Sequence, residues 1–386
     1  MDLICFSHLR WNFVYQRPQH LLSRFAKTYR VFYVEEPVYE NDVKHHLQFK
    51  KAQNNLWVVT PVLQPGLSIK ESNAVQHKLL KEMFEEYNLN LNIFWYYTPM
   101  ALAFTNNFTP EMLVYDCMDE LANFKFAPAG LKEYEAELFA KADVVFTGGH
   151  NLYKAKMKAH HNIFPVPSSI DKSHFVKARR NVELPADQEN IPLVRMGYYG
   201  VIDERMDIDL IKNVALKNPS WHFVMIGPVI KIDPASLPQL PNIHFLGNKS
   251  YEELPAYLSG WQIAIIPFLL NDATKYISPT KTPEYLSAGV PVISTPIADV
   301  VNPYGENNLV EIVNDEDEFT KAAKKILKNS SKEKWLNKVD AFLANNSWDN
   351  SFDFIMQELT KTKNKKGRTG QIRFINNSTS TVSIHV

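Results

Sequence analysis

Glycine is scarce in this sequence, which has 13 glycines among 386 residues. Neither G-x-G-x-x-G nor G-x-x-x-x-G-K occurs, so the glycine-rich loops that wrap around phosphates in dinucleotide-dependent dehydrogenases and P-loop enzymes are missing. Cysteine is scarcer still. Cys5 and Cys117 each lie in an apolar run, which excludes both a disulfide framework and a cysteine-based zinc site.

An excess of charge of either sign is also lacking. The 42 Lys and Arg residues balance 42 Asp and Glu residues, so we expect no nucleic-acid partner. The longest apolar run, Ile263 to Leu270, is too short to cross a bilayer. The opening residues Met1 to Phe6 lack the basic start of a signal peptide, and we therefore expect a cytoplasmic protein.

Short β-rich runs alternate with amphipathic helical stretches along the chain, a pattern typical of parallel sheets covered by helices. The pattern occurs twice, in residues 1–177 and 178–346, and the polar stretch from Asp171 to Pro192 is predicted to be the linker. We therefore expect an α/β protein with two Rossmann-like, doubly wound domains that face a central cleft. Ligands bind there, at the carboxyl ends of the strands.

The end of the chain is predicted to differ from these two domains. Phe352, Ile355, Met356 and Leu359 recur at the spacing of one helical face, which predicts an amphipathic helix within residues 347–360. Residues 361–386 are rich in Lys, Asn, Ser and Thr and are predicted to be a disordered tail. Their basic cluster is either a solvated terminus or a contact for anionic lipid, so we expect at most peripheral membrane contact.

Residues 277–295 combine features that suit an anionic ligand. Thr282 is predicted to cap a helix with Pro283 at its first position, so that the helix start and the N–H groups of residues 278–281 face outward together. Lys281 adds a positive charge, and Glu284 can accept hydrogen bonds from a ribose diol. The alternative is a Glu that only complements the helix dipole and a solvated loop Lys.

Polar and aromatic residues follow the first predicted strand, where a loop would meet the cleft. Trp11 is a candidate for stacking on a sugar, Arg17 for binding a phosphate, and His8 for contacting the acceptor. Two of them also have a structural alternative, a surface charge for Arg17 and a satisfied buried imidazole for His8. Asp119 follows the fifth strand, where its carboxylate can contact an acceptor hydroxyl, orient an arginine or cap the next helix.

The patterns that suggest a metal site are weak. Asp207 and Asp209 match a D-x-D motif, but at this spacing on a helix the two carboxylates do not share a face. The histidines of the pairs His45-His46 and His160-His161 are adjacent and lack the spacing of a helical metal site. We therefore assign no metal site and no cofactor.

The pattern S-P-x-K-x-x-E-Y-L-x-x-G-x-P-V-I-S-T, in residues 278–295, resembles the donor-binding signature of the retaining family 4 glycosyltransferases of GT-B fold. Residues 197–205 are similar to the first strand and loop of that family's second domain. Residues 7–20 resemble the opening of a bacterial envelope-polysaccharide subgroup that includes a teichuronic acid glycosyltransferase. The resemblance covers most of the chain, up to about residue 360.

The resemblance implies a hexosyltransferase that uses a UDP- or GDP-sugar as donor and a lipid-linked or polysaccharide acceptor. It implies that Lys281 and Arg205 stabilise the leaving diphosphate. Asp119, from its position after the fifth strand, is the third candidate catalytic residue. The resemblance also implies that the helix in residues 347–360 packs back on the first domain. The donor-binding residues that it implies are Gly200, Gly247, Ser278, Pro279, Thr280 and Glu284.

Two departures from the family pattern keep other functions open. Tyr276 stands eight positions before Glu284, where the family often has a second Glu, and Val201 stands where a basic residue is expected. The alternatives are a sugar-nucleotide epimerase of the same fold and a catalytically silent sugar-nucleotide-binding partner protein.

Overall fold

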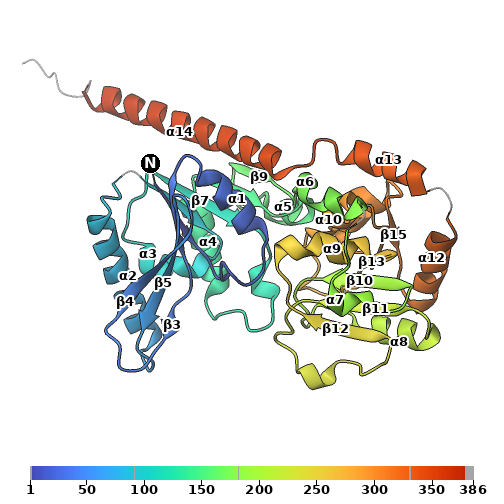
Figure 1. The fold of residues 1–386 in the computed structure, drawn as a ribbon. Helices are drawn as coiled ribbons and strands as arrows, with labels where there is room; N and C mark the ends of the chain where they lie inside the picture. The colour runs from blue at the N-terminus through green and yellow to red at the C-terminus, as the bar shows by residue number, and fades with distance from the viewer. Residues whose placement is uncertain (1, 91, 181, 330–331, 379–386) are drawn as a thin grey trace, which may run out of the picture.

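The protein has two lobes, each built on one β-sheet (Figure 1). The computed structural model describes residues 2–90, 92–180, 182–329 and 332–378, with side chains up to residue 366. Almost all strand pairs in both sheets are parallel, and the predicted α/β class with two sheets is confirmed.

The first sheet has the strand order β3-β5-β2-β1-β6-β7-β8-β9, with β4 paired antiparallel to β5. All five residues of β1 are buried, as expected for a central parallel strand that is covered on both faces. The strands are β1 (Asp2–Phe6), β2 (Arg30–Val34), β3 (Val38–Tyr39), β4 (His46–Gln53), β5 (Leu56–Leu63), β6 (Asn92–Tyr96), β7 (Met112–Cys117), β8 (Val144–Thr147) and β9 (Ile163–Pro165).

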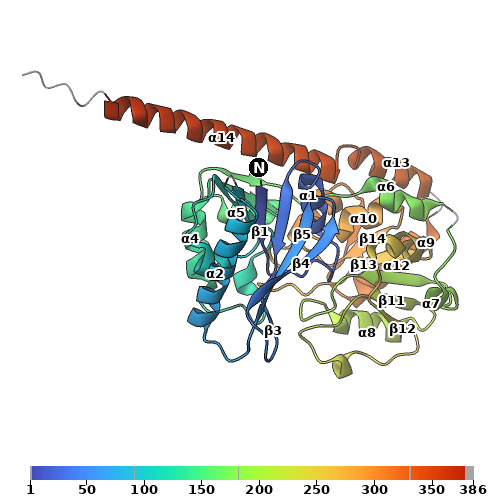
Figure 2. The ribbon, with the colours of Figure 1, turned by 60° about the vertical axis from the view of Figure 1, so that its left-hand side comes forward.

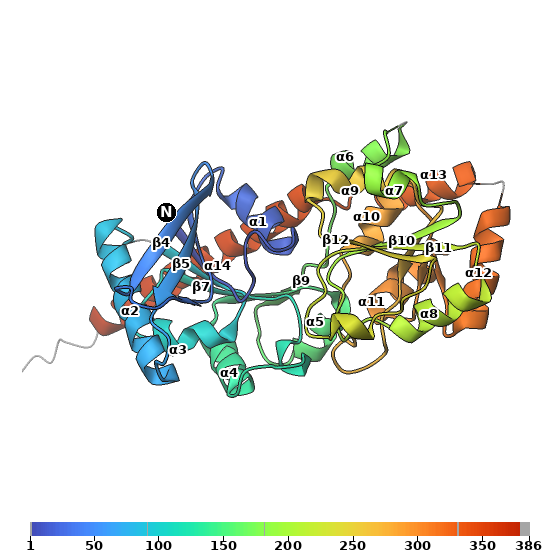
Figure 3. The same ribbon diagram turned by 60° about the horizontal axis from the view of Figure 1, so that its bottom comes forward.

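Helices cover both faces of this sheet, as Figure 3 shows from below. Leu3 and Cys5 of β1 point into a core shared with α1 and α14, whereas Ile4 and Phe6 point into the core under α2 to α5. The helices of this part of the chain are α1 (Arg17–Phe25), α2 (Ile69–Glu86), η1 (Pro99–Ala101), α3 (Leu102–Thr105), η2 (Leu121–Asn123), α4 (Leu131–Lys141) and α5 (His150–Lys156).

The second sheet has the order β12-β11-β10-β13-β14-β15. Its strands are β10 (Arg195–Tyr199), β11 (His222–Ile226), β12 (Ile243–Gly247), β13 (Ile263–Ile266), β14 (Val292–Ser294) and β15 (Val310–Ile312). The helices around it are α6 (Lys172–Phe175), η3 (Val176–Arg179), α7 (Ala186–Glu189), α8 (Ile208–Lys217), η4 (Pro234–Ser236), η5 (Tyr251–Glu253), α9 (Leu254–Ser259), α10 (Lys281–Ser287), α11 (Ala298–Val300), η6 (Val301–Gly305), α12 (Glu316–Lys328) and α13 (Lys332–Phe342).

The chain crosses between the lobes earlier than residue 177, where we predicted the boundary. Ile170 and Phe175 already lie in the apolar core of the second lobe, because α6 packs on the helices of that lobe. The predicted linker therefore belongs largely to the second lobe. A second crossing returns the chain at Trp348, whose N–H donates to the carbonyl of Ile170 at 3.1 Å, so the two crossings lie side by side.

Helix α14 (Trp348–Ser378) returns to the first lobe and runs along it, as Figures 1 and 2 both show. Trp348, Ile355 and Leu359 are buried in the same core as β1 and α1. Among the described residues, none of the helices combines the length and the apolar character that a membrane crossing requires.

The prediction of a disordered tail is wrong for residues 361–378, which continue α14. Lysine is a good helix former, and ion pairs hold this part of the helix in place: Lys363 with Glu111 at 2.7 Å, and Lys366 with Asp143 at 2.8 Å. The rest of the predicted tail, residues 379–386, lies outside the described residues.

Candidate active site

A cavity of about 560 Å³ lies between the two lobes, at the carboxyl ends of both sheets. Loops after β1, β7, β8 and β9 line it from the first lobe, and loops after β10, β11, β12 and β13 line it from the second. Ligands bind at this edge in doubly wound sheets. Most of the predicted site residues line it: Trp11, Arg17, Asp119, Gly200, Arg205, Ser278, Pro279, Thr280, Lys281 and Glu284.

The Lys281 ammonium extends into the cavity without an ion pair to any described carboxylate. Its Nζ lies 5.4 Å from the ring centroid of Tyr198. Gly200 makes room for it: a Cβ on Gly200 would lie 2.4 Å from Cε of Lys281, and the backbone φ of +133° is itself unfavourable for other residues. Burial lowers the pKa of Lys281 to about 8, Arg205 adds to the shift, and Glu284 opposes it.

Glu284 is a buried carboxylate at the wall of the same cavity. The hydroxyl of Tyr199, at the end of β10, donates to its Oε2 at 2.5 Å. Burial raises the pKa of Glu284 to about 7, against the hydrogen bond from Tyr199 and the positive charge of Lys281. The Glu284 carboxylate therefore changes its charge close to neutral pH.

Helix α10 begins earlier than predicted. Its first residue is Lys281, its N-cap is Thr280, and no side chain caps it, so the prediction that Thr282 is the cap is wrong. Pro283 is the third helical residue, and it is tolerated there because the first-turn N–H groups have no partner within a helix. Residues 278–280 lie outside the helix, as predicted, and only Lys281 of the predicted loop belongs to α10. The carbonyl of Ser278 accepts a hydrogen bond from the hydroxyl of Ser168 at 2.8 Å.

Arg205 is held firmly beside Lys281. Its Nε and Nη2 donate to the carboxylate of Asp203 at 3.0 and 2.7 Å, and its guanidinium lies 5.1 Å from the ring centroid of Phe124, a residue of the opposite lobe. Asp203 is buried and neutralises much of this charge. The loop that carries Phe124 also reaches the second lobe through Asn123, whose Nδ2 donates to the carbonyl of Asp272 at 3.0 Å.

Asp119 is the first-lobe carboxylate that faces these cations. Burial raises its pKa to about 6, and the charges of Arg205, Arg17 and Lys281 oppose that shift. The helical turn that follows has Glu120 at its N-cap and no side-chain cap, so the capping alternative for Asp119 is excluded. Its carboxylate is left available to the cavity.

The three predicted acceptor-side residues have different surroundings. Trp11 lines the cavity, with its ring 5.0 Å from that of Tyr33. Arg17 also lines it, but Asp116 pairs with its guanidinium at 2.8 to 3.0 Å, which argues against the predicted role in binding a phosphate. His8 is not among the lining residues, and burial lowers the pKa of its imidazole to about 4, so it is neutral at neutral pH.

Gly247 is likewise not among the lining residues. Its carbonyl accepts the N–H of Gly227 at 2.8 Å, and Gly227 is the residue that lines the cavity. The Asp207-x-Asp209 pair plays a local role, since Asp207 caps α8 by accepting the N–H of Leu210 at 2.9 Å. No three His, Cys, Asp or Glu side chains converge to hold a metal ion within the described part of the chain.

A carboxylate of the second lobe also contacts the first lobe directly. Asp299 accepts the N–H groups of His150 and Asn151 at 3.1 and 3.0 Å, and so caps α5 of the first lobe. A Cβ on Gly149, the N-cap residue of α5, would lie 2.1 Å from Oδ2 of Asp299. Glycine at this position therefore permits the contact between the lobes.

Sequence reasoning missed the residues that hold the site together: Tyr199, Asp203, Phe124 and Asp299. Tyr199 is the last residue of β10 and Asp203 lies in the loop after it, and the end of a central strand is the one signal that pointed to them. Phe124 and Asp299 act across the lobes, and no local pattern marks such contacts.

Comparison with known proteins identifies the fold as GT-B. Residues 204–329 match the family described as glycosyl transferases group 1. The chain is 25% identical over 222 residues to the Bacillus subtilis protein TuaH, assigned as a teichuronic acid biosynthesis glycosyltransferase. That match covers 52% of this chain and 54% of TuaH, so it spans about half the length of each protein.

Solved structures of similar fold match nearly the whole chain. One, described as trehalose-6-phosphate from E. coli bound with UDP-2-fluoro glucose, has a TM-score of 0.67 at 12% identity and covers 94% of this chain and 99% of its own. Sucrose-phosphate synthase from Thermosynechococcus elongatus has a TM-score of 0.67 at 14% identity, covering 93% and 98%. The predicted GT-B fold with two facing lobes is confirmed.

Proposed function

We propose that the protein is a retaining glycosyltransferase that moves a hexose-type sugar from a UDP- or GDP-sugar to a lipid-linked or polysaccharide acceptor in cell-envelope glycan synthesis. The match of residues 204–329 to group 1 glycosyltransferases supports the enzyme class. The assignment of TuaH to teichuronic acid biosynthesis supports an envelope acceptor. The UDP-2-fluoro glucose named for a protein of the same fold supports a nucleotide-sugar donor.

One observation carries the proposal: two cationic side chains and two carboxylates of raised pKa meet in one cavity between the lobes. Lys281 and Arg205 come from the second lobe with Glu284, and Asp119 comes from the first. Titratable groups with shifted pKa values in a cleft are typical of active sites. The cations suit a diphosphate, Glu284 suits the ribose diol, and Asp119 suits an acceptor hydroxyl.

In the proposed reaction, the bond between the anomeric carbon and the diphosphate oxygen breaks, and its electron pair stays on the diphosphate. The acceptor hydroxyl oxygen bonds to the anomeric carbon on the same face and passes its proton to the leaving phosphate oxygen. Lys281 and Arg205 stabilise the negative charge that grows on the diphosphate. Asp119 orients the acceptor hydroxyl, and no further cofactor takes part.

We place this reaction in the cytoplasm, where peripheral contact with the inner face of the membrane would bring a lipid-linked acceptor to the cavity. Three lysines of α14 are paired with carboxylates: Lys361 with Glu358 at 2.6 Å, Lys363 with Glu111 at 2.7 Å and Lys366 with Asp143 at 2.8 Å. These pairs reduce the positive charge that is available for lipid headgroups, so we expect any electrostatic contact with the membrane to be weak.

Slow hydrolysis of the donor in the absence of acceptor tests the proposal. Incubation with UDP-glucose, UDP-galactose, UDP-N-acetylglucosamine and GDP-mannose is expected to release free sugar and nucleoside diphosphate from one of them. Conversion to a new nucleotide sugar without free diphosphate would identify an epimerase instead. Tight nucleotide binding with no turnover in the presence of acceptor would identify a silent partner protein.

Replacing Glu284 with Gln is expected to weaken binding of the donor nucleotide by about 1 to 2 kcal/mol, because the neutral amide loses charge-assisted hydrogen bonds to the ribose. Isothermal titration calorimetry with UDP and GDP measures the change. Glu333→Gln, at an exposed position on α13, is the matched control and should leave affinity unchanged. Unchanged affinity of Glu284→Gln for both nucleotides would contradict the ribose assignment.

The value of kcat/KM for donor hydrolysis is expected to follow a bell-shaped pH profile. It rises as Asp119 and Glu284 ionise, with pKa values of about 6 and about 7, and falls as Lys281 loses its proton, with a pKa of about 8. The optimum therefore lies between 7 and 8. In Lys281→Arg the alkaline fall should disappear, because arginine stays protonated. An identical alkaline limb in that variant would rule out Lys281 as its origin.

A further inference from the structure

The loop from Trp11 to Gln16 forms the first-lobe wall of the cavity and places aromatic side chains on it. Tyr15 stacks on Tyr251 of the second lobe, with ring centroids 4.3 Å apart. Phe13 is half-buried at this wall and makes no ring contact with another described aromatic residue. The wall therefore presents the faces of aromatic rings to a ligand in the cavity.

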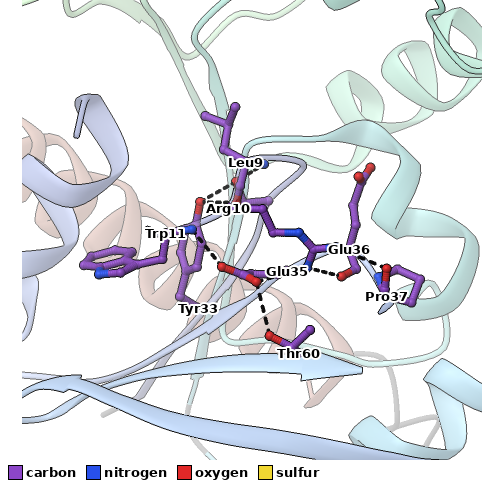
Figure 4. A network of polar contacts seen from close by, with 9 residues as sticks. Leu9, Arg10, Trp11, Tyr33, Glu35, Glu36, Pro37 and Thr60 are labelled. Carbon is purple, nitrogen blue, oxygen red and sulfur yellow. Dashed lines mark hydrogen bonds and ion pairs between the residues drawn. The ribbon is translucent and has the colours of Figure 1, made fainter. Parts of the chain in front are cut away.

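The two arginines that flank this loop, Arg10 and Arg17, both pair with carboxylates of the first lobe. Arg10 is not among the residues that line the cavity, and it donates to the carboxylate of Glu35 at 3.0 Å and the carbonyl of Glu36 at 2.6 Å (Figure 4). Arg17 is buried and pairs with Asp116, which is fully buried. Each positive charge is thus neutralised by a carboxylate of the same lobe.

No unpaired cation remains on this wall among the described residues that line it. Its one unpaired charged group is Asp119, whose carboxylate accepts no hydrogen bond from a described side chain. Apart from Arg17, which Asp116 neutralises, the cations that line the cavity are Lys281, Arg205 and Lys249 of the second lobe. An anionic group at the first-lobe wall would therefore meet negative charge without a partner, which is unfavourable in a partly buried site.

Gln19 holds the loop in one conformation. This residue of α1 is 1% exposed, and its Nε2 donates to the carbonyls of Trp11 at 2.6 Å and Val14 at 3.2 Å. Its Oε1 accepts the N–H of Gln16 at 3.0 Å. At the other end, Glu35 accepts the N–H of Trp11 at 2.7 Å, as Figure 4 shows. A loop fixed before binding loses less entropy when a ligand binds.

We propose that the Trp11–Gln16 loop is an acceptor subsite for an uncharged saccharide and that Gln19 is the positioning residue that holds it. The inference rests on the proposed function and adds the chemical class of the acceptor. The C–H face of a pyranose ring packs on the ring of Phe13, and the amides of Asn12 and Gln16, which line the cavity, suit its hydroxyls. A uronic acid or phosphorylated sugar lacks a cation to pair with here.

Saturation-transfer NMR with the full chain and saturating UDP tests this inference. The probes are methyl glucoside, methyl galactoside and methyl mannoside, each paired with the corresponding methyl uronide. We expect at least one neutral glycoside to bind about tenfold or more tightly than its uronide. Phe13→Ala should weaken that binding about two- to tenfold, the range of one aromatic contact. Phe126→Ala, which removes an exposed aromatic away from the cavity, is the matched control.

Gln19→Glu keeps the size of the side chain and places a carboxylate oxygen against the carbonyls of Trp11 and Val14, which now accept hydrogen bonds from Nε2. It should weaken glycoside binding severalfold while the dissociation constant for UDP stays within about twofold, which separates positioning of the loop from a general loss of folding. Equal weakening for glycoside and UDP would overturn the role of Gln19.

Three results would overturn the subsite itself: uronides that bind as tightly as neutral glycosides, no binding of any neutral glycoside, or a Phe13→Ala protein that binds like Phe126→Ala. Nucleotide binding is measured in the same samples by calorimetry. If UDP and GDP both fail to bind the parent protein, the proposed function fails. If a nucleotide binds and the saccharides do not, only this inference fails.

Discussion

Lys281→Ala is expected to lower the turnover of donor hydrolysis by about 10²- to 10³-fold, because it removes a charged donor aimed at the growing negative charge of the diphosphate. Donor affinity should fall less, since the charge to be stabilised is smaller in the ground state. Lys281 has no ion pair among the described residues, so its removal leaves no buried carboxylate without a partner. The turnover number and the dissociation constant of the nucleotide sugar are the quantities to measure.

Lys275→Ala is the matched control for this prediction, because Lys275 is exposed and lies six residues earlier in the same segment. Its effect on turnover and on donor affinity should each stay below about 0.5 kcal/mol. Arg205→Ala is harder to interpret, since it leaves the buried carboxylate of Asp203 unpaired, and its stability must be measured beside its turnover. Near-parental turnover of both Lys281→Ala and Arg205→Ala in EDTA would contradict the assignment. A loss that magnesium restores would show that a metal shares the diphosphate.

The central strands of both sheets could be recognised in the sequence. Short apolar, β-rich runs coincide with β1, β2, β8 and β11, because continuous apolar runs are the direct result of burial on both faces. The hairpin strand β4 was missed. Its polar sequence HLQFKKAQ alternates between half-buried and exposed positions at the sheet edge, where charged residues are favoured and apolar runs are absent.

The site was predictable where its residues lie in one segment. Lys281 and Glu284 are three positions apart, and both reach the cavity. The ion pair of Arg17 could not be predicted, because its partner Asp116 lies 99 positions away in the sequence. An arginine at the start of a helix looks the same in a sequence whether a carboxylate of a distant strand neutralises it or a ligand does.

The C-terminal helix α14 could be predicted only in part. The stripe Phe352, Ile355, Met356 and Leu359 predicted an apolar face, and Ile355 and Leu359 are buried against the first lobe. The continuation of α14 was not predicted, because its lysines satisfy Glu111 and Asp143, two carboxylates from distant parts of the chain. Composition alone could not show that those carboxylates lie beside the helix.

Trp348→Ala is expected to destabilise the protein by about 3 to 5 kcal/mol, the range for removing a large buried aromatic side chain. Trp348 is fully buried, and its ring stacks on His20 of α1 with centroids 4.6 Å apart and an interplanar angle of 13°. Chemical denaturation followed by circular dichroism measures the loss. Asp353→Ala, at an exposed position on the same helix, is the control and should change stability by less than about 0.5 kcal/mol.

The same substitution should also loosen the closed arrangement of the lobes, because Trp348 stands where the chain returns from the second lobe to the first. Its N–H is bonded to Ile170 at the other crossing, and His20 in turn contacts Tyr251 of the second lobe, with ring centroids 5.5 Å apart. Loss of the Trp348 ring should therefore raise the KM for the donor. A packing defect confined to the first lobe would leave this KM nearly unchanged. A chain that ends at Asn346 loses Ile355 and Leu359 as well and should be less stable still. Parental melting temperature and KM in both variants would show that α14 does not hold the lobes together.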